Sequence, residues 1–165
     1  MTSGVRVGQG VDVHPFSRDP ARGLVLGGVR IPEGPGLAGH SDADVVAHAL
    51  VDALLGAAGL GDMGTLFGSA EPVWAGADSG LFVAEALRRV RAAGWTVGNV
   101  DCTILAQHPP IAPHRGAITA SLARMLGIAE GAVGVKATTT DRLGFVGRGE
   151  GIACLAVAVL AGRSR

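Results

Sequence analysis

Residues 5–16 read V-R-V-G-Q-G-V-D-V-H-P-F, an alternation typical of a β-strand. Alternate side chains of an extended chain point to the same face. The apolar members of this alternation are Val5, Val7, Val11 and Val13. We expect these valines to face a core, while Asp12 and His14 emerge together on the opposite face. A polar pair held in this way costs free energy unless a ligand binds it, so the segment predicts a binding site at the end of a strand.

The rest of the chain intersperses strands and helices without a strict βαβ rhythm. Residues 23–32 predict a second strand that forms a hairpin with residues 5–14. A helix is predicted from residue 41, capped by Ser41 or Asp42 and ended by Gly59. Other expected elements are helices at 79–93 and 114–126, strands at 95–106, 133–140 and 152–160, and loops at 33–39, 68–78 and 141–151. We therefore expect an α+β fold, a mixed β-sheet with helices packed on one face, as one domain over residues 1–165.

Composition excludes several classes of protein. Fourteen basic residues balance fourteen acidic ones, and aromatic residues make up only 4% of the chain. Neither a nucleic-acid backbone nor stacked bases is therefore an expected partner. The N-terminus lacks the features of a signal peptide, and the longest apolar stretch, 152–161, is too short to cross a bilayer. We expect a cytoplasmic protein without a membrane partner, in which Cys102 and Cys154 are buried free thiols.

Metal-ligating side chains form the first candidate site. His48 lies on the predicted helix, with Asp44 and Asp52 one turn away on either side. A carboxylate in such a place can accept the second ring N–H of a metal-bound histidine. Asp12, His14 and His48 would then supply one carboxylate and two imidazoles, a set that suits zinc with an open fourth position. By spacing alone, a partly buried histidine near a capping aspartate is an equally good interpretation.

Three further motifs have both a functional and a structural interpretation. K-A-T-T-T-D at 136–141 places hydroxyls at a strand end, where they can hold phosphate, and Asp141 can hold a divalent cation. Threonines are also common in strands, so this motif alone favours a structural role. His40 and Ser41 precede a helix N-terminus, which attracts anions, or belong to an ordinary loop. Asp62, in G-D-M-G, can orient a substrate hydroxyl or begin a turn.

The motifs are more specific in combination. They are D-V-H, A-G-H-S-D-A-D-V-V-A-H-A-L, L-L-G-A-A-G-L-G-D-M-G, A-D-S, G-N-V-D, K-A-T-T-T-D-R-L-G-F and G-R-G-E-G-I-A, in this order. From Val7 to Val159, the sequence resembles the 2-C-methyl-D-erythritol 2,4-cyclodiphosphate synthase family. The resemblance favours the metal interpretation of His48. It also implies a stand-alone enzyme without a cytidylyltransferase domain.

The resemblance implies a reaction and an assembly. The family converts 4-diphosphocytidyl-2-C-methyl-D-erythritol 2-phosphate to the cyclic diphosphate and CMP, in the non-mevalonate route to isoprenoid precursors. It acts as a phosphorus–oxygen lyase, with zinc and with Mg²⁺ or Mn²⁺. The family forms a homotrimer around a central cavity, with active sites between subunits. We therefore expect a small cytidine diphosphate substrate as a partner, together with two further copies of the chain.

The resemblance also implies residue roles. Zinc would bind Asp12, His14 and His48, and Asp141 would hold the second ion in place of a family glutamate that is one methylene longer. His40 and Thr139 would stabilise the transition state. Substrate contacts are implied for Asp12, His14, Ser41, Asp62, Gly64, Thr138, Thr140 and Asp141, and for Ala106, Pro109, Ile111 and Ala112 in a cytidine pocket where Pro110 replaces a frequent lysine. Phe145 and Arg148 would meet an isoprenoid diphosphate in the central cavity, where Leu155 replaces a glutamate.

Two other functions are compatible with the same residues. A metal-dependent phosphohydrolase could use the three ligands to activate water. A non-catalytic trimer could bind isoprenoid diphosphates through its centre. Product analysis separates the first from a cyclising enzyme, because hydrolysis gives a linear product.

Overall fold

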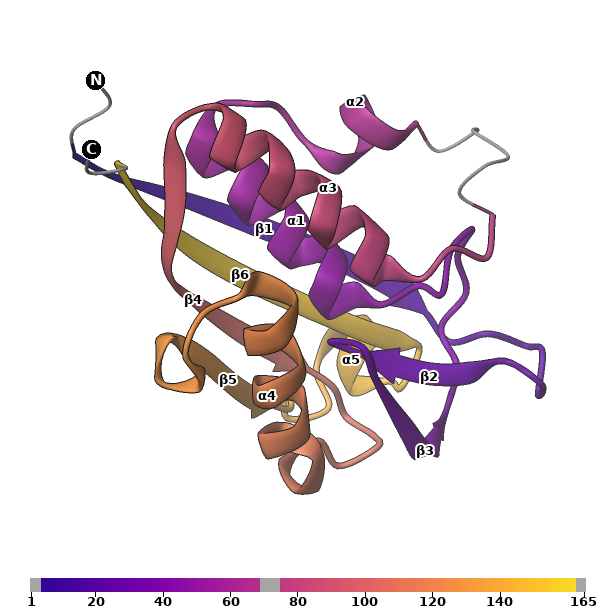
Figure 1. Cartoon of the computed structure of the whole chain (residues 1–165). Helices are drawn as coiled ribbons and strands as arrows, with labels where there is room; N and C mark the ends of the chain where they lie inside the picture. The colour runs from indigo at the N-terminus through magenta and orange to yellow at the C-terminus, as the bar shows by residue number, and fades with distance from the viewer. Residues whose placement is uncertain (1–3, 69–74, 163–165) are drawn as a thin grey trace.

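The computed structural model describes residues 4–68 and 75–162 (Figure 1). The elements are β1 (Val5–Pro15), β2 (Gly23–Leu26), β3 (Val29–Pro35), α1 (Val45–Ala58), α2 (Met63–Phe67), α3 (Ser79–Ala92), β4 (Trp95–Leu105), α4 (Arg115–Leu126), β5 (Val133–Thr138), α5 (Gly144–Gly147) and β6 (Gly151–Gly162). Short 3-10 turns lie at Ala112–His114 and Glu130–Ala132. The predicted helices and strands after residue 79 agree with these bounds to within two residues, apart from the short helix α5, which lies inside a predicted loop.

The main sheet is mixed. Its strand order is β1-β6-β4-β5. Strand β6 pairs antiparallel with both β1 and β4, whereas β4 and β5 are parallel. Helix α1 lies on β1 and β6, α3 packs against α1 and β4, and α4 covers β5 (Figure 1). The expected α+β fold, a mixed sheet with helices on one face, is confirmed.

The predicted hairpin between residues 5–14 and 23–32 is wrong. Residues 23–32 instead turn back on themselves, so that β2 pairs with β3 in a separate two-stranded sheet. The turn lies at Gly27 and Gly28, which both have positive φ angles, 57° and 75°. Two such residues allow a tight turn between antiparallel strands. The partner of β1 is therefore β6, from the far end of the chain.

Strand β1 presents the opposite face from the one predicted. Its side facing α1 carries glycine at positions 8 and 10, where an added Cβ at Gly10 would lie 1.9 Å from the carbonyl oxygen of Ala49. Helix α1 thus packs almost directly on the strand backbone. Asp12 and His14 continue this side of the strand. They therefore point towards the helix and not away from the core.

The valines of β1 are exposed in the single chain. The exposed fractions are 69% for Val5, 66% for Val7, 52% for Val11 and 45% for Val13. The sequence predicts the alternation correctly but assigns the buried and exposed faces the wrong way round. The helix can approach the strand closely only on the glycine face, because glycine has no side chain in the way. Together with Leu155 and Val157 of β6, these valines form what we call the outer sheet face.

The first helix begins later than predicted. Its N-cap is Asp44, whose side chain accepts hydrogen bonds from the N–H groups of Val46 and Ala47, so the prediction of Ser41 or Asp42 as cap is wrong. The predicted end at Gly59 is confirmed, with φ at 71°. Nearly all of α1 is buried, because it lies between the sheet and α3.

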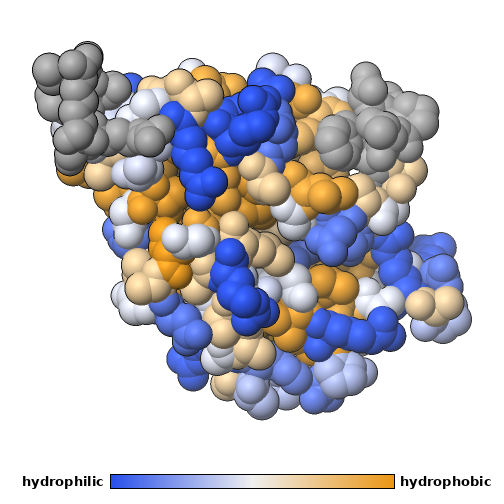
Figure 2. Space-filling model, in the orientation of Figure 1, coloured by the Kyte–Doolittle hydropathy of each residue, from blue (hydrophilic) through white to orange (hydrophobic). Residues whose placement is uncertain are grey.

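The remaining surface features are ordinary. Seen from the helix side, hydrophilic and hydrophobic residues are interspersed (Figure 2). Cys102 and Cys154 are buried free thiols, as expected. Among the described residues, no helix is long and apolar enough to cross a membrane. The predicted loop at 68–78 lies partly outside the described residues.

Candidate metal centre

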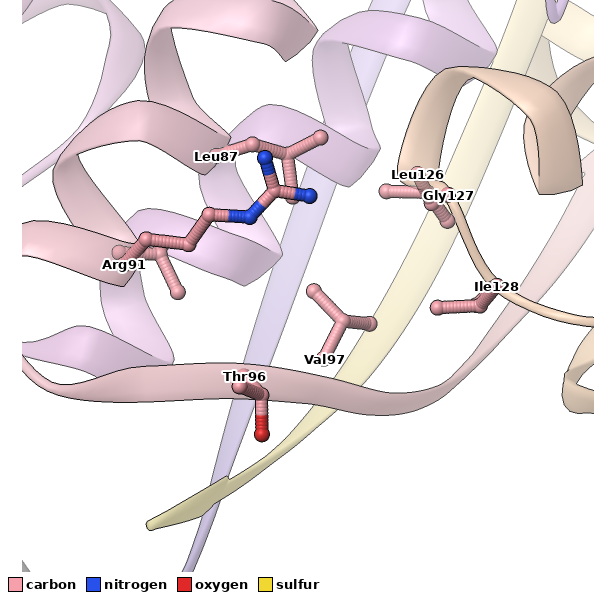
Figure 3. Close-up of a pocket in the computed structure, with 8 residues that line it drawn as sticks. Leu87, Arg91, Thr96, Val97, Leu126, Gly127 and Ile128 are labelled. Atoms are coloured by element: carbon pink, nitrogen blue, oxygen red, sulfur yellow. The ribbon is translucent and has the colours of Figure 1, made fainter. Parts of the chain in front are cut away.

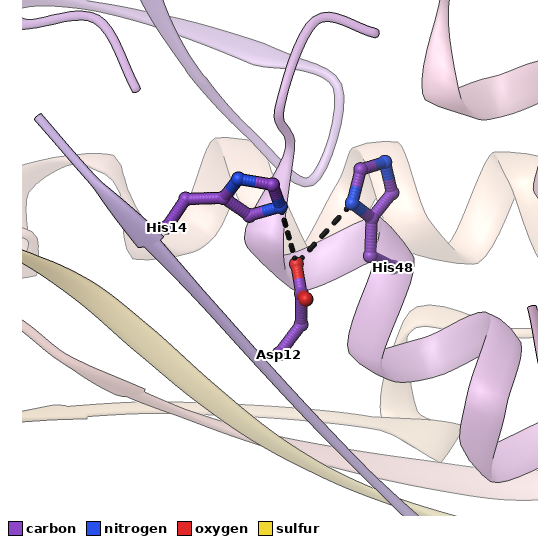
Figure 4. A group of neighbouring side chains, drawn as sticks. All are labelled: Asp12, His14 and His48. Carbon is purple, nitrogen blue, oxygen red and sulfur yellow. Dashed lines mark hydrogen bonds and ion pairs between the residues drawn. The ribbon is translucent and has the colours of Figure 1, made fainter. Parts of the chain in front are cut away.

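Asp12, His14 and His48 converge where the end of β1 meets α1 (Figure 4). One ligand atom from each side chain lies within 4.8 Å of the other two. Asp12 Oδ2 lies 2.9 Å from His14 Nε2 and 3.2 Å from His48 Nδ1. The strand supplies two of these groups because residues 12 and 14 share one face. The helix supplies the third because it crosses that face closely.

The far nitrogen of His14 is held by the backbone. Its Nδ1 lies 2.7 Å from the carbonyl oxygen of Ala38. A carbonyl oxygen can only accept, so Nδ1 carries a proton. In the neutral ring, Nε2 then has a lone pair directed at Asp12 Oδ2. This orientation is the one that a histidine ligand to a metal requires.

The far nitrogen of His48 is held by serine hydroxyls. Its Nε2 lies 2.8 Å from Ser79 Oγ and 3.2 Å from Ser41 Oγ. Behind the ring stands Phe82, with the two ring centres 5.9 Å apart. The ring is therefore enclosed on this side, and its Nδ1 is the atom that faces Asp12.

The predicted partners of His48 are wrong. Asp44 accepts hydrogen bonds from the N–H groups of Gly27 and Gly28, at 2.8 and 2.7 Å, besides capping α1. Asp52 accepts one from the Met63 N–H group, at 2.7 Å. Both carboxylates serve neighbouring segments of backbone and do not hold the imidazole. Helical spacing shows which residues of the helix are neighbours, but it does not show which other segment of the chain contacts them. The actual partners of Asp44 and Asp52 therefore could not be predicted from the sequence pattern.

The three side chains need a cation between them. Burial would raise the pKa of Asp12, but hydrogen bonds from His14 and His48 outweigh it and lower the pKa to about 2. Burial would lower the pKa of His14, yet its hydrogen bond to Asp12 and the charge of that carboxylate raise it. A proton shared with the carboxylate therefore satisfies the cluster when no metal is bound. A divalent cation can replace it, since one carboxylate and two imidazoles are a suitable donor set.

Residues 138–141, which we call the threonine loop, lie far from the metal ligands within one chain. Val13 of β1, Ala153, Leu105 and Thr138 of β5 form one row across the sheet. Three strand spacings separate the ends of the row, or about 14 Å. One chain therefore does not bring Thr138 next to the metal ligands.

The threonine loop is exposed and shaped by its own hydrogen bonds. The Thr140 hydroxyl donates to the Leu143 carbonyl oxygen at 2.7 Å, and the Asp141 N–H donates to Thr139 Oγ1 at 3.3 Å. Asp141 has a positive φ of 51°. The strand ends at Thr138, earlier than predicted, so Thr139 and Thr140 belong to the loop.

The predicted cytidine pocket adjoins this loop. The Ala106 N–H donates to the Thr138 carbonyl oxygen at 3.0 Å, and the Arg142 N–H donates to Gln107 Oε1 at 3.3 Å. Ala106, Pro109 and Ile111 are buried, whereas Pro110 and Ala112 are exposed. The structure thus groups the residues predicted to hold phosphate with those predicted to hold cytidine.

The other predicted residues fall into two places. Ser41 is buried beside the metal ligand His48, whereas His40, the residue before it, is exposed. Asp62 caps α2, where its carboxylate accepts from both the N–H and the hydroxyl of Thr65 at 2.7 Å. These two hydrogen bonds lower the pKa of Asp62. Gly64 lies in the first turn of α2.

Residues predicted to meet an isoprenoid lie around α5. Phe145 is 40% exposed, and Leu155 is 36% exposed on the outer sheet face. Arg148 already has an anionic partner, because its Nε lies 2.7 Å from Glu150 Oε1. A ligand diphosphate would therefore compete with Glu150 for this guanidinium group.

A cavity of about 150 Å³ lies elsewhere, between α3, β4 and the end of α4 (Figure 3). Its lining residues are Leu87, Val90, Arg91, Thr96, Val97, Leu126, Gly127 and Ile128. None of them belongs to the predicted site, and we assign no part of the chemistry to this cavity.

Comparison with known proteins identifies the family. Residues 5–161 match the model of the YgbB family. The chain belongs to the YgbB family. It is 54% identical over 157 residues to the 2-C-methyl-D-erythritol 2,4-cyclodiphosphate synthase of Alkalilimnicola ehrlichii, covering 95% of both chains. It is 55% identical over 156 residues to the synthase of the same name from Azoarcus sp., covering 94% of this chain and 95% of that one.

Solved structures agree with this membership. The YgbB family chain superposes on the bifunctional IspDF of Campylobacter jejuni with a TM-score of 0.93 and 40% identity, covering 99% of this chain and 44% of that one. It superposes on the CDP complex of IspF from Plasmodium falciparum with a TM-score of 0.86 and 34% identity, covering 99% of this chain and all of that one. The YgbB family fold is therefore shared with both structures.

Proposed function

We propose that this YgbB family chain converts 4-diphosphocytidyl-2-C-methyl-D-erythritol 2-phosphate to 2-C-methyl-D-erythritol 2,4-cyclodiphosphate and CMP, in the non-mevalonate route to isoprenoid precursors. The observation that carries the proposal is the convergence of Asp12, His14 and His48, in a chain with relatives that carry the synthase name at 54% identity or more. Residues 1–165 would act as one cyclodiphosphate synthase domain.

The reaction is an intramolecular phosphoryl transfer. An oxygen of the 2-phosphate attacks the β-phosphorus, and the bond from that phosphorus to the oxygen of the leaving CMP breaks. Such a reaction depends on positioning and charge neutralisation more than on a covalent nucleophile. Asp12, His14 and His48 would hold zinc, which would supply Lewis-acid chemistry, and Asp141 would hold Mg²⁺ or Mn²⁺, which would offset phosphate charge.

The protein's own groups would hold the substrate on either side of the reacting phosphorus. His40 and Thr139 donate to the oxygens on which negative charge develops. Asp62 is oriented by its hydrogen bonds to Thr65 and accepts a substrate hydroxyl, while Ser41 contacts the methylerythritol phosphate. The loop from Ala106 to Ala112 holds the cytidine.

A homotrimer would complete this site. The threonine loop lies about 14 Å from the metal ligands across the sheet of one chain, too far for one substrate diphosphate to touch both. The exposed apolar residues of the outer sheet face also need a cover. We propose that the metal centre of one subunit faces the threonine loop of its neighbour, around a central cavity. Phe145 and Arg148 are the residues that would meet an isoprenoid diphosphate there.

A CMP-release assay tests the proposal. The purified protein with Zn²⁺ and Mg²⁺ should release CMP and form the cyclic diphosphate, and a chelator should stop both. His48→Ala should lower turnover at least about 100-fold and release bound zinc, because it removes a ligand. His114→Ala is the matched control, since His114 does not belong to the cluster of metal ligands and its Nε2 instead lies 2.9 Å from Glu33 Oε2. A linear phosphate product would instead identify a phosphohydrolase, and unchanged CMP release by His48→Ala would refute the metal assignment.

A further inference from the structure

The ring of His48 can bind a metal through only one nitrogen at a time. Its Nδ1 faces Asp12 at 3.2 Å, and its Nε2 faces Ser79 at 2.8 Å. A neutral imidazole carries one proton, so the nitrogen that holds the proton determines which nitrogen is free to bind. A metal ligand at Nδ1 requires the proton to stay on Nε2.

Ser79 lies between His48 and a carboxylate. The Ser79 hydroxyl donates a short hydrogen bond to Asp42 Oδ1, and the Ser79 N–H donates to Asp42 Oδ2 at 2.9 Å. An ionised carboxylate can only accept. The hydroxyl hydrogen of Ser79 is therefore committed to Asp42, and its oxygen can only accept from His48 Nε2–H.

Asp42 is itself fixed by backbone groups. Its Oδ1 accepts from the Asp44 N–H at 3.1 Å, and its own N–H donates to the Ala77 carbonyl oxygen at 3.2 Å. These contacts hold the carboxylate between the start of α1 and the start of α3. The direction of the Ser79 hydroxyl therefore follows from the fold and not from solvent.

Ser41 does not determine which nitrogen of His48 carries the proton. Its oxygen lies 3.2 Å from His48 Nε2 and accepts from the Ala43 N–H at 3.2 Å. No carboxylate is bonded to its hydroxyl among the described residues, so that hydroxyl can donate to His48 or accept from it. Of the two serines, Ser79, backed by Asp42, is the one that distinguishes the two neutral tautomers of the ring.

Because Ser79 and His48 are buried, water cannot replace the hydrogen bond that keeps the proton on His48 Nε2. Ser79 is 1% exposed and His48 is 6% exposed. In such surroundings an unpaired N–H or lone pair costs more than it does in water. Without the serine hydroxyl, the ring would lose a partner that solvent cannot replace.

We propose that Asp42 and Ser79 are positioning residues for the metal centre, acting in series to keep the proton of His48 on Nε2 and its Nδ1 lone pair towards the metal. This proposal rests on the metal site of the proposed function. It extends the centre by two residues that make no contact with the metal ligand atoms themselves. It also ties the first turn of α3 to the metal, since Ser79 opens that helix.

The test measures metal affinity directly, by competition of the full chain with a chromophoric chelator for Zn²⁺. Ser79→Ala should weaken zinc binding about 10- to 100-fold, the usual loss for a group behind a metal-ligating histidine. Ser79→Thr keeps the hydroxyl and should recover most of the affinity. Asp42→Asn should give an intermediate loss, because an amide oxygen is a weaker acceptor than a carboxylate. The visible spectrum of the Co²⁺-loaded protein should change in Ser79→Ala, as the His48 ring is free to turn.

Asp78→Ala is the matched control. Asp78 caps α3 through the Gly80 N–H at 2.7 Å but does not bond to His48, so this variant loosens the same helix turn without touching the chain of hydrogen bonds. If Ser79→Ala bound zinc as tightly as the wild type, or lost no more affinity than Asp78→Ala, the positioning proposal would be wrong while the metal site stood. If His48→Ala also kept its zinc, the metal site of the proposed function would be wrong.

Discussion

At the scale of single residues, the metal centre depends on where each polar group finds its second partner. His14 is oriented by the Ala38 carbonyl oxygen, and His48 by the Ser79 hydroxyl. Ala38 lies in the loop before α1 and Ser79 is the first residue of α3, and both fix a proton on the nitrogen that points away from Asp12. The ligand atoms are therefore arranged before a metal arrives, which reduces the reorganisation that binding requires.

Asp44 provides a prediction at this scale. Its buried carboxylate accepts hydrogen bonds from four backbone N–H groups, two in the β2–β3 turn and two in α1. Asp44→Ala would leave these groups without their acceptor and should lower the free energy of unfolding by about 3 kcal/mol. Asp44→Asn keeps one carbonyl oxygen and should lose less. Urea denaturation of both variants measures the difference.

Asp78→Ala serves again as the control for a helix cap. Asp78 is exposed and makes a single capping hydrogen bond, so its loss should cost about 1 kcal/mol. If Asp44→Ala and Asp78→Ala lowered the free energy of unfolding equally, the hydrogen bonds from Gly27 and Gly28 to Asp44 would not stabilise the protein.

At the scale of elements, the close approach of α1 to β1 decides where the ligands meet. Glycine at positions 8 and 10 lets the helix backbone approach the strand, and this brings His48 within reach of Asp12. The same approach leaves the valines on the other side of the strand. Core packing and site geometry therefore share one cause.

Gly10→Ala tests this dependence. The new Cβ would lie 1.9 Å from the Ala49 carbonyl oxygen, so the helix must shift away from the strand. We expect a loss of about 3 kcal/mol in stability, at the upper end of overpacking effects, together with weaker zinc binding as His48 moves. Thermal or urea unfolding measures the first effect, and chelator competition measures the second.

Gly116→Ala is the matched control for this substitution. Nothing lies within 4 Å of a Cβ added at Gly116, in the first turn of α4. Alanine there should be neutral or stabilise by up to about 1 kcal/mol, since alanine is the better helix former. A Gly10→Ala protein with unchanged stability would contradict the packing argument.

At the scale of the whole molecule, one face of the sheet remains without cover in the single chain. The outer sheet face carries four exposed valines of β1, with Leu155 and Val157 beside them. Contiguous exposed apolar residues of this kind are typical of an interface. The separation of the metal ligands from the threonine loop, about 14 Å across the sheet, gives the chain a functional reason to assemble with further copies.

Val11→Lys tests the proposed trimer. A charge at the centre of an apolar interface should dissociate the assembly, because burying an unpaired ammonium group is costly. Light scattering after size-exclusion chromatography should show a smaller particle, and CMP release should fall at least about 10-fold while the zinc content stays the same. Ala84→Lys, on the exposed side of α3, should change neither mass nor activity. If Val11→Lys assembled to the same mass as the wild type, the outer sheet face would not be the trimer interface.

The helices and strands could be predicted well from the sequence where a local signal marks them. Gly59 ends α1 and Gly127 ends α4, because both adopt the left-handed conformation that glycine tolerates. The strands at 95–105 and 151–162 follow from β-branched and apolar runs bounded by polar or glycine-rich segments. These signals act within a few residues, so they need no knowledge of the rest of the fold.

The pairing of β1 and the partners of His48 could not be predicted in this way. Alternation in residues 5–15 determined that Asp12 and His14 share a face, but only the approach of α1 decided which face is buried. Helical spacing put Asp44 and Asp52 near His48, yet the ring is held by Ser79, 31 residues away in sequence. The sequence by itself singled out Asp12, His14 and His48 as one candidate metal site. The tertiary structure decided which groups hold these side chains, because hydrogen bonds and close packing join segments whose separation along the chain leaves no local pattern.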